Sequence, residues 1–130
     1  MPLALPALLT LFAILWYIVT SMQVGRLRGK CKIEAPATTG DPAFERAFRV
    51  QMNELEQLVA FLPAMWIFAV YGSPLYAAIA CASYIVGRIV YALGYWAAAE
   101  KRSTGFGIAF MILAGTWIAA LVSVIRTLAA

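Results

Sequence analysis

The stretch QLVAFLPAMWIFAVYGSPLYAAIACASYIVG, residues 57–87, decides the fold because it contains no charged side chain. Gly72-Ser73-Pro74 marks a tight turn between its two apolar segments. The segment before the turn, 57–71, gives about 22 Å of helix, which is too short to cross a hydrocarbon core of about 30 Å. Both helices must therefore continue outward from the turn, and we predict a helical hairpin with arms at about 43–72 and 74–101.

Two further uncharged runs flank this hairpin. Residues 1–25 give about 37 Å of helix, and residues 103–125 are also uncharged. The first run has no basic leader and ends in a basic cluster, so we expect a retained helix rather than a cleaved signal peptide. The sequence predicts one all-α integral membrane domain over residues 1–130, with four transmembrane helices at about 2–26, 43–72, 74–101 and 103–128.

The composition excludes several classes of protein. Hydrophobic residues make up 64% of the chain and charged residues 12%, and the mean hydropathy is +0.85. Soluble domains are about 45–50% apolar and about 25% charged, and disordered chains are polar. The chain has no histidine and only two cysteines, which argues against a histidine-bound metal, a Ser-His-Asp triad or a disulfide scaffold. We expect no metal and no nucleic-acid partner.

Basic residues predict the orientation in the membrane. Lys101 and Arg102 lie between the third and fourth helices, and the turn at 72–74 carries no charge. The first loop is flanked by Arg26, Arg28, Lys30, Lys32, Arg46 and Arg49. Because basic loops stay on the cytoplasmic side, we expect the first and third loops there and both termini opposite.

Charged residues also occur where lipid is expected. Arg88 lies in the middle of the third span, where an ionisable group costs about 2.5–3.5 kcal/mol and normally has a partner or a function. Counted from the turn at 1.5 Å per residue, Glu56 lies about 24 Å down one arm and Arg88 about 21 Å down the other. We therefore predict a Glu56–Arg88 pair.

Spacing extends this pair into two polar stripes. One helix face carries Arg49, Asn53 and Glu56 at i, i+4 and i+7, and the facing one carries Arg88, Tyr91 and Tyr95 at i, i+3 and i+7. The stripes fit either of two interpretations. They can simply join helices or form an aromatic belt. Alternatively, since the arginines outnumber nearby acids and guanidinium groups bind carboxylates in bidentate fashion, they can bind an anionic ligand.

These residues resemble a known family. The segment FERAFRVQMNELE, residues 44–56, resembles the R-x-Q-x-N-x-x-E signature of the MAPEG superfamily, membrane-associated proteins in eicosanoid and glutathione metabolism. The resemblance continues through RIVYALGY at 88–95, through Arg102, and through the upstream loop ATTGDPAFER at 37–46. It covers nearly the whole chain.

The resemblance implies a homotrimer of four-helix bundles that binds reduced glutathione, as co-substrate, between neighbouring subunits near the cytoplasmic face. Arg102 matches the position that stabilises the glutathione thiolate, and Tyr91 joins it as the second catalytic candidate. The positions that contact or frame glutathione match Arg28, Arg49, Gln51, Asn53, Glu56, Arg88, Tyr91 and Tyr95. A second arginine found beside Arg28 in some members is replaced here by Gly29, which puts the substrate preference in doubt.

The implied function is that of a glutathione S-transferase embedded in membrane lipid, either in a bacterial inner membrane or in the endoplasmic reticulum. Its thiolate would attack a lipophilic electrophile from the bilayer, or reduce a lipid hydroperoxide as a glutathione peroxidase does. We expect the lipophilic groove to involve Ile108, Met111, Ile112 and Trp117. The alternative is a non-catalytic, lipid-binding membrane scaffold of the same fold.

Overall fold

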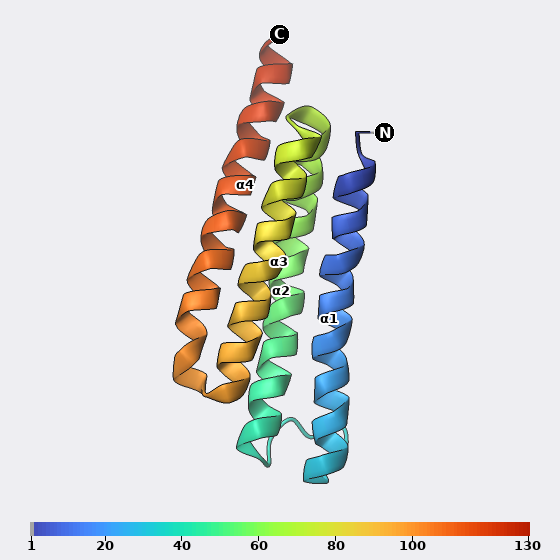
Figure 1. Ribbon diagram of the computed structural model, residues 1–130, viewed down its shortest axis with the longest axis vertical. Coiled ribbons are helices and arrows are strands. Elements are labelled where there is room, and N and C mark those ends of the chain that lie inside the picture. Colours follow the sequence, from blue (N-terminus) through green and yellow to red (C-terminus); the bar gives the residue numbers. More distant parts are fainter. Residues whose placement is uncertain (1) are drawn as a thin grey trace.

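Four long helices run antiparallel in the computed structural model, which describes residues 2–130 (Figure 1). They are α1 (Ala4–Cys31), α2 (Pro42–Tyr71), α3 (Pro74–Ala97) and α4 (Ser103–Ala129), and a short 3-10 helix, η1 (Ala99–Arg102), joins α3 to α4. Both termini lie at one end of the bundle, with the α1–α2 loop and the α3–α4 turn at the other. Each long helix is long and apolar enough to cross a membrane, as predicted.

Two helix ends differ from the predicted ranges. α1 continues beyond residue 26 to Cys31, where Lys32 closes it in a left-handed conformation (φ 55°). The prediction ended the helix at the first charges, but arginine and lysine are good helix formers and extend it. α3 ends at Ala97 rather than near 101, because Ala98 is extended and the residues after it form η1.

Side-chain caps fix the starts of α2 and α3. The Asp41 carboxylate accepts hydrogen bonds from the backbone N–H groups of Ala43 (2.8 Å) and Phe44 (3.3 Å). These bonds, with the one from Phe44 foremost, hold the pKa of the Asp41 carboxyl below its usual range. At the other end of the bundle, the Ser73 hydroxyl accepts from the Tyr76 N–H, and Pro74 occupies the first turn of α3.

The bundle interior combines aromatic stacking with close backbone approach. Phe61 of α2 stacks on Tyr84 of α3 with 3.9 Å between ring centroids. Gly105 lies against the backbone of Tyr91, and a Cβ at this position would overlap the Tyr91 backbone nitrogen. Only glycine allows α4 to approach α3 this closely, and the contact sets the first turn of α4 beside Tyr91.

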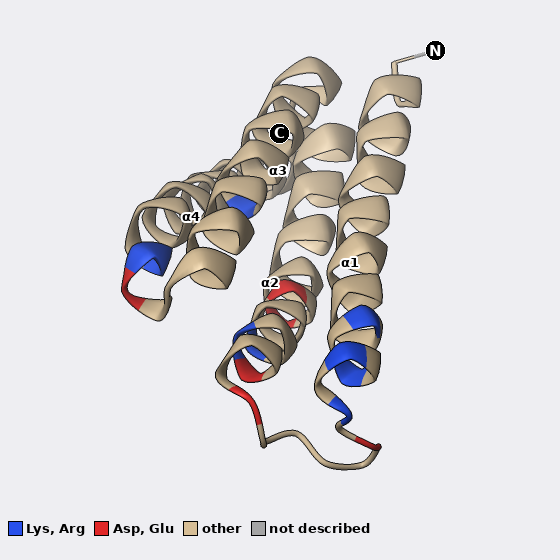
Figure 2. Ribbon diagram, turned by 60° about the horizontal axis from the view of Figure 1, so that its bottom comes forward, with Lys and Arg blue, Asp and Glu red and all other residues tan. Residues whose placement is uncertain are grey.

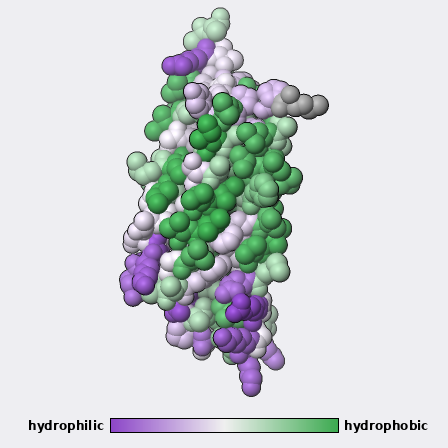
Figure 3. Space-filling view, viewed as in Figure 1, coloured by the Kyte–Doolittle hydropathy of each residue, from purple (hydrophilic) through white to green (hydrophobic). Residues whose placement is uncertain are grey.

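The outer surface is apolar along the middle of the bundle (Figure 3). Leu11, Val59 and Met111 are each about two-thirds exposed, at 64%, 68% and 70%. Charged residues gather mainly at the end that holds the α1–α2 loop and the α3–α4 turn, here called the basic end (Figure 2). Such a surface suits lipid along the helices and water or headgroups at the ends.

Candidate functional site

A polar hollow of about 430 Å³ lies at the basic end, between α2, α3 and the start of α4. Each helix contributes residues one turn apart, so that their side chains share a face. The hollow is lined by Arg49, Asn53, Tyr91, Tyr95, Arg102, Ser103 and Phe106. The structure thus brings together five of the residues predicted from the two polar stripes and from the start of the fourth helix.

Aromatic rings form the inner wall of this hollow. Tyr91, only 2% exposed, meets Tyr95 edge to face with 5.7 Å between ring centroids. Phe106 lies 6.3 Å from Tyr91 and stacks on Phe110 at 5.9 Å, almost parallel. Phe106 and Phe110 are 39% and 48% exposed, so this aromatic pair leads from the hollow to the apolar surface of α4.

Two guanidinium groups at the hollow have no carboxylate partner within residues 2–130. Arg102 is exposed, lies over the Tyr95 ring at 5.7 Å, and donates to the Ala99 carbonyl oxygen (2.8 Å). Arg49 is exposed and makes neither a side-chain hydrogen bond nor an ion pair in that range. The hollow therefore offers positive charge and phenol hydroxyls, a combination suited to carboxylates and to a thiolate.

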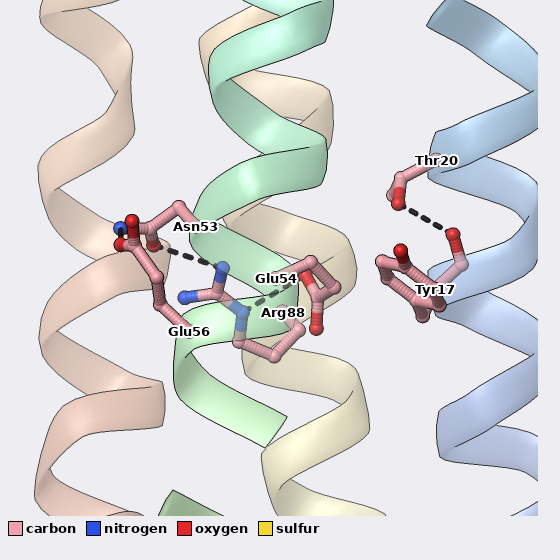
Figure 4. Close-up of polar contacts among 6 residues, drawn as sticks. All are labelled: Tyr17, Thr20, Asn53, Glu54, Glu56 and Arg88. Carbon is pink, nitrogen blue, oxygen red and sulfur yellow. Dashed lines mark hydrogen bonds and ion pairs between the residues drawn. The ribbon is translucent and has the colours of Figure 1, made fainter. Parts of the chain in front are cut away.

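The predicted Glu56–Arg88 pair is wrong, because Arg88 pairs with Glu54. Arg88 Nε donates to Glu54 Oε2 at 3.0 Å, and both side chains are 1% exposed (Figure 4). The predicted depth of the acid along the bundle was nearly correct, because Glu54 and Glu56 are only two residues apart. Successive helix residues lie about 100° apart, however, so these two side chains point about 200° apart around α2. Glu54 points to α3, whereas Glu56 is exposed.

Asn53 connects the buried pair to the exposed acid. Arg88 Nη2 donates to Asn53 Oδ1 (3.1 Å), and Asn53 Nδ2 donates to Glu56 Oε2 (3.4 Å) (Figure 4). Arg88 itself is fully buried and does not line the hollow. It lies behind Tyr91, with its guanidinium carbon 4.2 Å from the ring centroid.

Besides Arg88, three predicted glutathione residues do not line this hollow: Glu56, which contacts it only through Asn53, and Arg28 and Gln51. Arg28 donates to the Ala37 carbonyl oxygen (2.7 Å) and lies over the Phe44 ring at 4.8 Å. The Gln51 amide donates to the Ser21 hydroxyl of α1 (3.3 Å). Arg28 of α1 and Gln51 of α2 therefore both lie between these two helices, and within one copy of the chain they do not meet Arg49 or Arg102.

Some residues of the hollow were not predicted. Ser103 and Phe106 line it; Phe106 follows Arg102 by four residues, the spacing that places two side chains on one helix face, whereas the spacing gives no such signal for Ser103. Of the helix-four residues expected at a lipophilic groove, three are well exposed: Ile108, Met111 and Trp117. Ile112 instead packs against the core. Within residues 2–130, no cluster of three metal-ligating side chains occurs.

Comparison with known proteins places this geometry in a family. The model of the MAPEG family matches residues 6–122, which is most of the chain. The chain belongs to the MAPEG family. This confirms the resemblance drawn from the segments at 44–56 and 88–95, and it makes the four-helix bundle a multi-pass integral membrane protein.

Three relatives show the range of proteins that this MAPEG chain resembles. An uncharacterized protein of Synechocystis is 52% identical over 103 residues, covering 79% of this chain and 75% of the relative. Human microsomal glutathione S-transferase 2 is 43% identical over 94 residues, covering 72% and 64%. Leukotriene C4 synthase of Cavia porcellus is 37% identical over 99 residues, covering 76% and 66%. The match thus spans slightly less than two thirds of the two named enzymes.

Proposed function

We propose that this protein is a membrane-bound glutathione transferase that uses the hollow at the basic end as its glutathione site. The observation that carries the proposal is the pair of arginines without carboxylate partners, Arg49 and Arg102, beside Tyr91 and Tyr95 in one cavity. Glutathione has two carboxylates, an ammonium and a thiol. Relatives named glutathione S-transferase and leukotriene C4 synthase support this choice of ligand.

Each group of glutathione has a partner of suitable chemistry. Arg49 binds a carboxylate with its guanidinium fork, Glu56 receives the ammonium, and Asn53 supplies neutral hydrogen bonds. Arg102 faces the sulfur and, as a permanent cation, favours the thiolate over the thiol. The Tyr91 hydroxyl donates a hydrogen bond to the same sulfur, since its ring forms the inner wall.

The reaction begins with the thiolate, because the thiolate and not the thiol is the nucleophile. The thiol proton leaves to water, and the sulfur forms a bond to an electrophilic carbon. With an aryl halide the halide departs; with an epoxide the C–O bond breaks and its oxygen takes a proton. With a lipid hydroperoxide, two glutathione molecules give the disulfide, an alcohol and water.

The assembly that completes this site is a homotrimer. Arg28 and Gln51 lie on the α1 side of α2, away from the hollow of their own chain. In the proposed trimer, both reach glutathione in the hollow of a neighbouring copy, so that the site is shared between subunits. The basic end lies in the cytoplasm by the positive-inside rule, so glutathione enters from that side.

A conjugation assay tests the proposal. Purified protein in detergent is given glutathione and 1-chloro-2,4-dinitrobenzene, and wild type is compared with Arg102→Ala and with Lys101→Ala as the neighbouring cation control. We expect Arg102→Ala to lower kcat by about a hundredfold, the scale for loss of one electrostatic stabiliser. It should also abolish the ultraviolet absorbance of the bound thiolate while glutathione still binds.

The control variant Lys101→Ala and the alternative function, a lipid-binding scaffold, each predict a distinct result. Lys101→Ala should leave kcat within about twofold, since Lys101 does not line the hollow. Normal turnover by Arg102→Ala would remove its assigned role. A wild-type protein that binds lipid but neither binds nor conjugates glutathione would instead be the non-catalytic scaffold of the same fold.

A further inference from the structure

Glu54 has no part in the chemistry proposed above, yet it is one of the most deeply buried side chains. It is 1% exposed, and its partner Arg88 is fully buried. Burying an ion pair costs several kcal/mol per ion and is compensated only when the geometry and the surrounding hydrogen bonds are good. The remaining contacts of the Arg88 guanidinium show what this arrangement achieves.

The guanidinium is directed at two walls of the glutathione hollow. While Nε donates to Glu54, Nη2 donates to Asn53 Oδ1 at 3.1 Å, and the central carbon of the group lies 4.2 Å from the Tyr91 ring centroid. Asn53 and Tyr91 both line the hollow. Arg88 therefore supports two residues of the site from behind without reaching the site.

The bond to Arg88 also determines what Asn53 presents to a ligand. Because its oxygen accepts from the guanidinium, the Asn53 amide nitrogen must face outward, where it donates to Glu56 at 3.4 Å. The reversed amide would place N–H donors against N–H donors. A chain of contacts thus runs from the core carboxylate through Arg88 and Asn53 to the exposed carboxylate of Glu56 (Figure 4).

We propose that Glu54 is a positioning residue of the glutathione site. Its carboxylate anchors Arg88, which in turn fixes the Asn53 amide and the Tyr91 ring that bound the hollow. The inference rests on the proposed function and adds a residue to it. Two acids two positions apart therefore have different roles, Glu56 meeting the ligand and Glu54 acting only through Arg88.

The test compares Glu54→Gln, which keeps the shape and removes the charge, with wild type in the conjugation assay. We expect the KM for glutathione to rise about tenfold, equivalent to about 1.4 kcal/mol. The kcat at saturating glutathione and the thiolate absorbance should change less than threefold, since Arg102 is untouched. Tyr84→Phe, a change in the same buried layer that leaves the walls of the hollow intact, is the matched control and should keep the wild-type KM.

A double-mutant cycle separates positioning from general stability. If Glu54 acts through Asn53, then Glu54→Gln should raise KM less than twofold further in an Asn53→Ala background. Additive effects of the two substitutions, or a KM unchanged in Glu54→Gln, would overturn the inference. Should Glu54→Gln fail to fold, Glu54→Asp decides: a KM raised about threefold supports the inference, and an unchanged KM overturns it.

The two proposals fail in different ways. If wild type neither binds glutathione by calorimetry nor conjugates it, the proposed function fails and the role of Glu54 fails with it. If wild type is active and the Glu54 variants have the same KM for glutathione as wild type, the proposed function stands and the positioning role alone is rejected.

Discussion

The two ends of the bundle each carry a hollow lined by arginine, tyrosine and serine, but they are built differently. At the basic end, Arg49 and Arg102 share about 430 Å³ with Tyr91 and Tyr95. At the end that holds the termini, a hollow of about 570 Å³ is lined by Tyr71, Tyr76, Arg126 and several hydroxyl groups, and is here called the far hollow.

The far hollow also has an arginine without a carboxylate partner in residues 2–130, Arg126, so the difference lies in its hydroxyl groups and in what lies behind the walls. In the far hollow, the Ser123 hydroxyl donates to the Ala119 carbonyl oxygen (2.7 Å), Thr127 donates to the Ser123 carbonyl oxygen (3.0 Å), and the Ser73 hydroxyl caps α3. The hollow at the basic end instead has a buried layer behind it, the Glu54–Arg88 pair, which orients its walls. Size and lining alone therefore do not distinguish the two hollows, whereas the buried ion pair behind one of them does.

The largest effect in this comparison is expected from the close contact between α3 and α4. Gly105→Ala places a Cβ on the Tyr91 backbone, and Gly115→Ala meets no atom within 4 Å. We expect Gly105→Ala to cost about 3 kcal/mol, the upper part of the range for overpacking, and to abolish most conjugation. Thermal unfolding and the conjugation assay check this, and equal behaviour of the two variants would show that α4 shifts freely.

Arginine substitutions at the two ends test whether only one hollow binds glutathione. Arg49→Ala should weaken glutathione binding by roughly tenfold to a hundredfold, since a hydrogen bond to a charged group is worth about 1.5–3 kcal/mol. Arg126→Ala should leave the affinity unchanged. Calorimetric titration measures both, and a loss at Arg126 would move the site to the far hollow.

A smaller effect is expected from Glu56, the exposed acid at the basic end. Glu56→Gln should weaken glutathione binding about threefold to tenfold, whereas Glu45→Gln, an exposed acid in the first turn of α2, should have no effect. An analogue of glutathione without the amino group should bind wild type and Glu56→Gln equally. If the analogue still distinguishes the two proteins, Glu56 does not bind the ammonium.

The smallest effect is expected at the caps of α2 and α3, because the Asp41 carboxyl titrates and the Ser73 hydroxyl does not. The Asp41 pKa is lowered in the folded protein, so its stabilisation is full above the usual carboxyl pKa and is lost as the pH falls through the folded value. Ser73, the cap at the other end, has no such charge. The protection of amides near Ala43 against hydrogen exchange should therefore fall below about pH 4, while the protection near Tyr76 stays constant. In Asp41→Asn the pH dependence near Ala43 should disappear.

The spans and the depth of the polar residues were predictable because both follow from charge spacing and a fixed rise per residue. The partner of Arg88 was not, because it depends on the rotation of α2, and because the guanidinium reaches Glu54 and Asn53 on adjacent faces at once. The place of Arg28 and Gln51 was not predictable either. The family resemblance predicts a role with glutathione for both, but it does not give the side of the helix on which a ligand lies.

The aromatic pair formed by Phe106 and Phe110 has a consequence for how the proposed reaction is measured. The pair joins the hollow to the exposed apolar side of α4, so an oily substrate of the proposed reaction would arrive by lateral diffusion through the bilayer and not through water. Its relevant concentration is then a mole fraction in lipid, set by its partition coefficient. Diluting the same amount of substrate with additional vesicles should slow turnover even though the bulk molarity stays constant.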